Sequence, residues 1–492
     1  MKVASILLMC ATSLAGCSLA PDYKPPAMTL PAGFKEIAVK DPGPWQPAKP
    51  SDTLPRGAWW SDFHDPTLDG LEAKIDSNNA DLAASVARYD QARAYAAATS
   101  ASLLPFADLD ASTNRDRESA QRPLRGKNLP NQYGANTASL EVGYEIDFWG
   151  RIHNTIAAGA ALAQASAADL EVVRLGLHAE LAGDYIKLRG LDAELKLLID
   201  TVDAYSRAAT LTQDRYKGKI ASGIDVSRSE SQLDSAKALM SDVTAERALL
   251  EHAIASLVGE PASSFSLAPA IVDINLPGIP PGMPSTLLER RPDIAEAERR
   301  VAAANAGIGV AKAAFYPDIS LGLLGGFQDT GSLARLISAP YSFWSVGPQL
   351  TIPLFEGGLL EARERQAYAV FDEESNKYRS TVLAAFQEVE DNLALLHHLG
   401  QEAVDEGAAV RAAEHTAQMS LSLYKDGAFS YLDVVVAQTD ALQAERTLLD
   451  LNTRRLQTDV RLIRAVGGGW DASSLANDDA VRVIADRETA KP

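Results

Sequence analysis

The sequence is poor in cysteine, in aromatic residues and in positive charge. It contains 492 residues, of which two are cysteines and 7% are aromatic, and its formal net charge is −19. A chain this acidic lacks the basic surface on which non-specific nucleic-acid binding depends, so we expect no nucleic-acid partner. The sequence shows neither a Walker loop nor an HExxH pattern, nor any other catalytic constellation. We therefore expect no enzymatic activity, no cofactor and no metal site.

Both cysteines lie near the N-terminus. Met1-Lys2, followed by the apolar residues 6–9, is typical of a secretory signal that is too short to span a membrane. Its end, Leu-Ala-Gly-Cys17, resembles the bacterial lipoprotein box, in which the cysteine is lipidated and becomes the new N-terminus. An ordinary cleaved signal that happens to contain a cysteine is the alternative. We predict a lipoprotein signal peptide over residues 1–17, lipidation of Cys17 and, because Cys10 leaves with the signal, no disulfide.

Long apolar runs are also missing. No run of 18 apolar residues follows the signal, so a helical membrane span is not expected, and a membrane-embedded part would have to be a closed β-barrel. Residues 137–148 have the pattern of a barrel strand, because apolar residues alternate with polar and acidic ones. A strand of a soluble sheet shows the same alternation. A weaker partner strand is predicted near residues 106–114.

The chain contains two copies of one long unit. Residues 216–225 (YKGKIASGID) and 424–433 (YKDGAFSYLD) carry Tyr, Ser and Asp at the same spacing, 208 residues apart. Each stretch interrupts a long helical pattern, which begins at Gly150 in the first copy and at Gly358 in the second. At 1.5 Å per residue each helix would be about 100 Å long. Apolar residues in the first helix recur at heptad spacing, which favours coiled-coil packing.

This repeat divides the chain. We predict an extended N-terminal segment (residues 18–64), a first repeat (65–260), a proline-rich linker (261–284), a second repeat (285–468) and a polar tail (469–492). Each repeat is expected to contain a helix, two strands, a long helix, a tip and a return helix. The leading helices are predicted over residues 68–103 and 285–314, and the strand pairs at about 105–148 and 316–355.

Four strands cannot close a membrane barrel, for which about eight is the smallest number. The barrel must then be shared between subunits, and the apolar stripes of the long helices also need neighbours. A symmetric ring meets both needs. A dimer, a trimer and a tetramer remain open at this point.

Four motifs then resemble one family: Trp59-Trp60, YEIDFWGR at 144–151, LLERRPDI at 287–294 and GPQLTIPLFEGG at 347–358. Together they resemble the TolC-type outer-membrane efflux factors, in the lipoprotein branch that includes the OprM and NodT proteins. The resemblance implies an α+β homotrimer: twelve strands form a transmembrane barrel, and the duplicated coiled-coil helices form a periplasmic α-barrel.

Function follows from the same resemblance. It implies a lipid-anchored outer-membrane protein that extends into the periplasm, contacts outer-membrane lipid and docks onto a periplasmic adaptor (membrane fusion protein) and an inner-membrane RND-type pump. Such a protein is a passive export duct for small molecules. The alternatives are the duct of a type I protein-secretion system and a structural coiled-coil envelope lipoprotein.

The tips are the candidate site. In the family the second tip closes the periplasmic entrance, so the resemblance makes Leu432 and Asp433 gate candidates, with Asp225 as the counterpart in the first tip. A plain helix N-cap is the alternative for both aspartates. A second acid one turn further on is absent, because that position is Val436. The expected tip and adaptor contacts are Tyr216, Lys219, Ser222, Tyr424, Gly427 and Ser430; Lys219 occupies the usual glycine position of the first tip.

Overall fold

The structure is a computed structural model. It describes residues 18–28, 34–36, 57–119, 121, 130–272, 274, 290–331 and 335–468. The predictions for residues 1–17, including Cys17, and for the tail 469–492 therefore lie outside the described residues.

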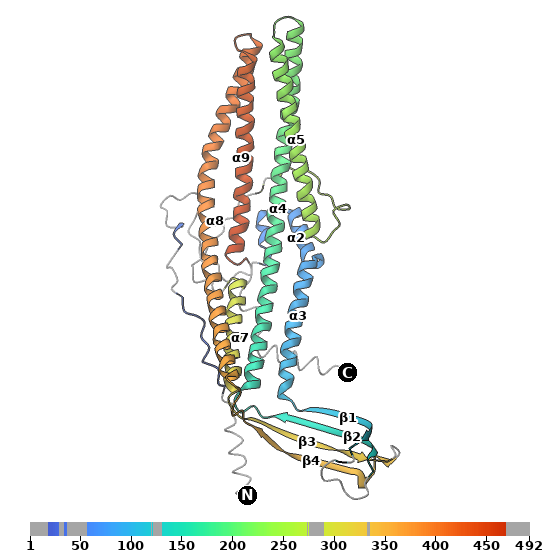
Figure 1. Cartoon of the computed structure of the whole chain (residues 1–492). Coiled ribbons are helices and arrows are strands. Elements are labelled where there is room, and N and C mark those ends of the chain that lie inside the picture. Colours follow the sequence, from blue (N-terminus) through green and yellow to red (C-terminus); the bar gives the residue numbers. More distant parts are fainter. Residues whose placement is uncertain are drawn as a thin grey trace.

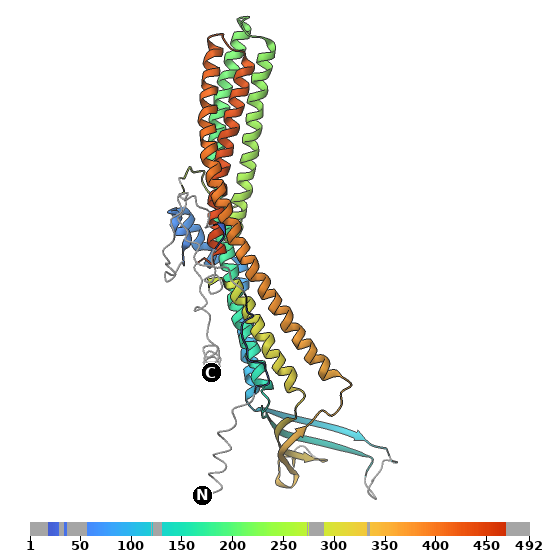
Figure 2. The same cartoon turned by 90° about the vertical axis from the view of Figure 1, so that its left-hand side faces the viewer.

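The chain is elongated, with long helices that stand on a small sheet (Figure 1). Two helical hairpins reach the end farthest from the sheet, and the strands lie at the opposite end, turned away from the helix axes (Figure 2). The helices are η2 (Trp59–Phe63), α2 (Pro66–Asn78), α3 (Ala80–Ser100), η3 (Ala101–Leu103), α4 (Arg151–Lys217), α5 (Gly223–Leu257), α7 (Pro292–Ala313), η5 (Ala339–Tyr341), α8 (Leu359–Lys425) and α9 (Tyr431–Ala465). The strands are β1 (Phe106–Arg117), β2 (Gln132–Glu145), β3 (Asp318–Asp329) and β4 (Ser342–Thr351).

The first helix prediction, residues 68–103, was wrong in one respect. The helix is interrupted at Asn79, whose backbone is extended and whose side chain accepts a hydrogen bond from the Leu82 backbone N–H. This is an N-cap, which starts a new helix rather than continuing the old one. The apolar periodicity runs on through this position, so it conceals the break. The N-terminal segment 18–64 also contains the short helix η2, which its composition did not predict.

Equivalent contacts occur in the two repeats: the residue before α3 contacts the end of α5, and the residue before α7 contacts the end of α9. Asn79 donates from Nδ2 to the carbonyl oxygen of Leu257 at the end of α5 (2.8 Å). The buried side chain of Arg291, from the family motif, donates to the carbonyl oxygen of Ala465 at the end of α9 (2.9 Å). Leu257 and Ala465 are separated by 208 residues. Each contact satisfies a carbonyl that the end of a helix leaves without an intrahelical partner.

The strands form one antiparallel sheet in the order β1-β2-β3-β4. The register places Leu109 opposite Leu140, and Val142 opposite Leu323, so these side chains share one face. Leu323 lies in turn opposite Val346. Leu109, Leu140, Leu323 and Val346 are all exposed. The predicted alternation of apolar and polar residues is therefore confirmed, and it extends across all four strands.

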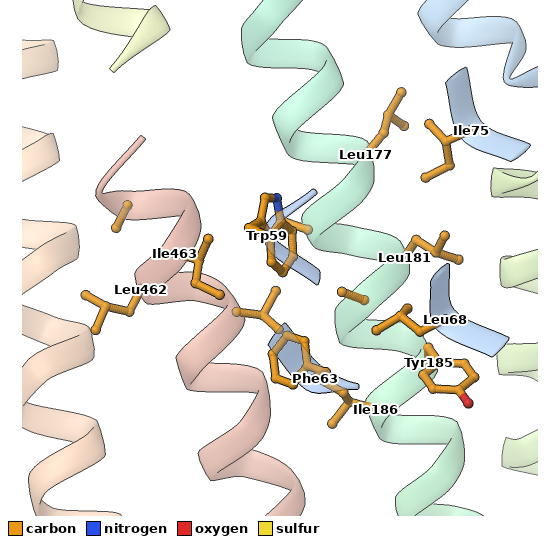
Figure 3. Packing of buried hydrophobic residues seen from close by; sticks show 14 of the residues in the cluster. Trp59, Phe63, Leu68, Ile75, Leu177, Leu181, Tyr185, Ile186, Leu462 and Ile463 are labelled. Carbon is orange, nitrogen blue, oxygen red and sulfur yellow. The ribbon is translucent and has the colours of Figure 1, made fainter. Parts of the chain in front are cut away.

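The main hydrophobic core lies between α4 and α9 (Figure 3). Trp59 and Phe63 of η2 fill the space between these long helices, and Leu68 and Ile75 of α2 extend the core on the opposite side of α4; all four side chains are buried. Each fully buried side chain of this kind contributes about 1.5–3 kcal/mol. The Trp59-Trp60 motif thus anchors η2 to the long helices.

One described helix meets the length and composition criteria for a membrane span. An 18-residue window in α4 has a mean hydropathy of 1.3, and 50% of it is buried inside the chain. Buried helices of water-soluble cores meet the same criteria, and α4 packs against α3, α5, α7 and α9. The window therefore carries little weight as evidence for a helical span.

Candidate functional site

The two predicted tips lie side by side at the end of the molecule farthest from the sheet (Figure 1). The first joins α4 to α5 and the second joins α8 to α9. At both positions the long helix ends in a short turn, and a serine starts the return helix: Ser222 in the first tip and Ser430 in the second.

Asp225 and Asp433 both take part in capping boxes at the start of the return helices. Each forms a capping box with its serine: Asp433 Oδ2 accepts from the backbone N–H of Ser430 (3.1 Å) and from its hydroxyl (2.7 Å), and Asp225 Oδ2 makes the same two contacts with Ser222 (3.1 and 2.8 Å). The predicted N-cap role was therefore wrong in position: Ser222 and Ser430 are the N-caps, and each aspartate supports its serine from the third helical position. This supporting role leaves the gate hypothesis for Asp433 intact, because one oxygen makes both contacts and the residue is exposed.

The two aspartates differ in their charged surroundings. Asp225 lies 4.0 Å from Arg228, measured from Oδ1 to Nη1, which partly compensates its charge. Among the described residues no basic side chain forms an ion pair with Asp433. The second tip therefore carries the less compensated negative charge.

Apolar side chains flank Asp433. Leu432 is 44% exposed, and Val436, one turn further along α9, is 51% exposed. The second tip thus presents a carboxylate between two apolar side chains. The first tip exposes Ile220 and Ile224.

A buried aromatic pair supports the second tip. Tyr424 and Tyr431 meet edge to face with ring centroids 5.2 Å apart, and Tyr424 is only 5% exposed. Such burial goes against the expected direct contact of the Tyr424 side chain with an adaptor. Tyr216, its counterpart in the first tip, is exposed and remains available for such a contact.

Sequence reasoning missed Arg215, which links the two hairpins. Its guanidinium carbon lies 4.8 Å from the centroid of the Tyr424 ring, and Nη1 donates to the carbonyl oxygen of Lys425 (3.1 Å). Arg215 belongs to α4, and both its partners belong to α8. A cation over an aromatic face contributes about 0.5–2 kcal/mol. No local pattern marks this residue, because its partners are about 210 positions away.

The two turns have the same backbone conformation despite their different sequences. Lys219 has φ 61° and Gly427 has φ 79°, so both are left-handed, whereas Gly218 has φ −76°. The lysine therefore takes the conformation that glycine takes in the second tip. A lysine at the usual glycine position therefore leaves the turn unaltered, but it holds a left-handed conformation that is strained for a residue with a side chain.

Comparisons with known proteins fit this geometry. The family model described as outer membrane efflux protein matches residues 73–260 and 283–468, which is most of the chain. The chain belongs to the outer membrane efflux protein family. Its two matched segments correspond to the two repeats.

Relatives of this outer membrane efflux protein cover almost its whole length. One is the probable efflux pump outer membrane protein TtgC of Pseudomonas putida, 30% identical over 97% of this chain and 98% of its own. Another is nodulation protein T of Rhizobium leguminosarum bv. trifolii, 30% identical over 93% and 96%. The solved structure of the outer-membrane channel OprN is 28% identical, covers 92% of this chain and 100% of its own, and has a TM-score of 0.82.

These comparisons confirm the predicted family, the α+β fold class, the outer-membrane location and, in general form, the efflux function. The family is one of channel proteins. In the part of the chain that the structure describes, no cluster of three or more His, Cys, Asp or Glu side chains could hold a metal ion.

Proposed function

We propose that three copies of this chain form a passive export duct for small molecules. Their sheets would close a twelve-stranded barrel in the outer membrane, and their hairpins would form a tunnel across the periplasm. A periplasmic adaptor and an inner-membrane RND-type pump would complete the system. The relatives named as components of efflux pumps support this assembly.

The sheet carries the proposal. One face of all four strands is apolar and exposed, which suits contact with lipid, and the opposite face carries Asp108, Asp110 and Glu141. The outer strands β1 and β4 have no partner on their outer edges among the described residues. Unpaired backbone groups are not tolerated in the hydrocarbon of a bilayer, so the sheet must continue into neighbouring copies.

Residues 18–23 support a lipid anchor at Cys17. The Ser18 hydroxyl donates to Asn154 Oδ1 (2.9 Å), in the first turns of α4 next to the sheet, and Asn305 donates to the Pro21 carbonyl oxygen (2.9 Å). The described chain therefore begins beside the junction of helices and sheet. Trp149 stacks on Tyr316 at this junction, with ring centroids 4.6 Å apart. Aromatic residues at this level are typical of the membrane interface.

The second tip is the proposed gate. Threefold symmetry would bring three copies of Leu432 and Asp433 together, and a ring of carboxylates favours cations while impeding anions. Asp225 would act mainly in its capping box. Arg215 would hold the second hairpin against the first and so keep the gate closed. The exposed residues Tyr216 and Lys219 are the proposed adaptor contacts, together with the backbone at Gly427.

Single-channel recording in planar bilayers tests the duct and its gate. We expect low conductance from the purified protein and a higher conductance from the double variant Leu432→Ala with Asp433→Ala. The matched control is Ile224→Ala with Asp225→Ala, which removes the same kind of capping contact and one apolar side chain from the first tip. Its conductance should rise less.

Two results would contradict the proposal. Unchanged conductance of the second-tip variant would remove Leu432 and Asp433 as the constriction. Absence of any conductance, together with a monomer in chemical cross-linking, would instead favour a structural coiled-coil lipoprotein.

A further inference from the structure

The linker after α5 docks onto the first hairpin through a buried group of charges. Arg247 donates from Nε to Asp192 Oδ1 (2.6 Å) and from Nη2 to the carbonyl oxygen of Leu267 (2.5 Å). The backbone N–H of Leu267 donates to Glu251 Oε1 (2.5 Å), and that of Ala270 donates to Asp192 Oδ2 (3.1 Å). Arg189 also donates from Nη1 to the carbonyl oxygen of Ala268 (3.0 Å). Residues 267–270 are thus held on the groove between α4 and α5 by two arginines and two carboxylates.

The second repeat keeps part of this arrangement. The residues 208 positions after Arg247 and Glu251 are Arg455 and Asp459, again one turn apart on the return helix. Here both groups lack their partners. Asp459 is 2% exposed, and its Oδ2 and the Nε of Arg455 are buried without a hydrogen bond in the part of the chain that the structure describes. Buried polar atoms in folded proteins are normally hydrogen-bonded, so these two atoms call for a partner.

One missing partner is explained by a difference on the long helix. The counterpart of Asp192 is Gly400, so α8 offers Arg455 no carboxylate. A side-chain carbon built on Gly400 would meet no atom within 4 Å, so the groove has open space at that point.

The tail has the residues that the groove lacks. Leu475-Ala476 repeats Leu267-Ala268 at the same offset of 208, and the counterpart of Ala270 is Asp478. The two repeats therefore carry the carboxylate on different segments. In the first repeat the long helix supplies Asp192 and the linker has Ala270. In the second repeat the long helix has Gly400 and the tail supplies Asp478.

We propose that residues 475–478 of the tail dock onto the groove between α8 and α9, as residues 267–270 dock between α4 and α5. The Leu475 backbone N–H donates to Asp459, and the Asp478 carboxylate enters the space at Gly400 and accepts from Arg455. The length of chain suits this contact, because Leu475 follows Asp459 by 16 residues, as Leu267 follows Glu251. The chain also turns at equivalent left-handed glycines, Gly259 and Gly467. This docking does not depend on channel activity.

Hydrogen–deuterium exchange of the full-length protein in detergent, followed by mass spectrometry of the tail peptide 471–479, tests the docking. In the wild type we expect these amides to exchange at least ten-fold more slowly than in Asp478→Ala. Adding Gly400→Asp to Asp478→Ala recreates the arrangement of the first repeat and should restore the protection. The matched control is Asp479→Ala, which changes the neighbouring acid and should exchange like the wild type.

Three outcomes would overturn the docking. The first is a wild-type tail that exchanges at the rate of an unstructured peptide, and the second is an equal effect of Asp479→Ala. The third is Arg455→Gln accelerating exchange in residues 37–56 while the tail is unchanged, since the N-terminal segment would then be the occupant. If Gly400→Asp does not fold, the two tail variants still decide the question, because they lie outside the helices.

Discussion

A buried carboxyl group gives the stability of this protein a defined pH dependence. Glu72 on α2 is fully buried, and its Oε2 lies 2.6 Å from Nδ1 of His178 on α4. Trp60 stacks on the imidazole with ring centroids 4.4 Å apart. The other oxygen of Glu72 has no hydrogen-bond partner among the described residues. Burial raises the pKa of Glu72 to about 7, although the hydrogen bond and charge of His178 oppose the shift.

The sign and size of the effect follow from this pKa. The ordinary value is 4.5, so between about pH 4.5 and pH 7 the folded protein keeps a proton that the unfolded chain has released. The free energy of unfolding therefore falls as the pH rises through this window. At about 1.4 kcal/mol per pH unit the fall amounts to about 3 kcal/mol at most. Glu72→Gln removes the titration, so its stability relative to the wild type should increase between pH 5 and pH 8.

Urea unfolding in detergent, followed by circular dichroism at pH 5 and pH 8, measures this difference. The control is Glu246→Gln, because Glu246 is an exposed residue of α5. The difference in the free energy of unfolding between Glu246→Gln and the wild type should be the same at both pH values. The reasoning would be refuted if the difference in the free energy of unfolding between Glu72→Gln and the wild type did not change with pH. Glu72 would then ionise as easily in the folded protein as in the unfolded chain.

Two further predictions concern the tips. Lys219→Gly should stabilise the protein by about 1 kcal/mol in urea unfolding, because it relieves a left-handed lysine. The control is Lys217→Gly at the last residue of α4, which has no such strain to relieve and should not stabilise the protein. A loss of stability in Lys219→Gly would contradict the strain. Tyr424→Phe should be neutral or stabilising by about 1 kcal/mol, because the buried Tyr424 hydroxyl has no hydrogen-bond partner among the described residues. A thermal melt in which Tyr424→Phe unfolds well below the wild type would show that this hydroxyl does have a partner.

The strands and the tips could be predicted because each depends on neighbouring residues. The repeat could be predicted because the same short motifs recur 208 residues apart. Strand alternation needs only neighbouring residues, and Ser222 and Ser430 stand at cap positions that a single turn defines. The interruption at Asn79 could not be predicted in this way, because the apolar periodicity continues through it and the partner of Asn79, Leu257, is remote in sequence. The same holds for Arg215. Its role appears only when both hairpins are packed together.

The capping of Asp433 shows how a correct pattern can leave a function undecided. Spacing identifies the Ser-Asp pair, and the structure shows the capping box. Whether the same carboxylate narrows a pore depends on the arrangement of three chains around an axis. That arrangement is a property of the assembly and has no signature within one copy of the sequence.

The corresponding helices of the two repeats have equal lengths, which places the two tips at the same level. α4 and α8 both have 67 residues, and α5 and α9 both have 35. An α-helix rises 1.5 Å and turns 100° with each residue. A single residue inserted into α4 alone would therefore lift the first tip by about 1.5 Å and rotate it by about 100° relative to the second, parting Arg215 from Tyr424. A change in the length of one hairpin therefore preserves the contact between Arg215 and Tyr424 only when the other hairpin changes by the same amount. We expect the lengths of the two hairpins to change together.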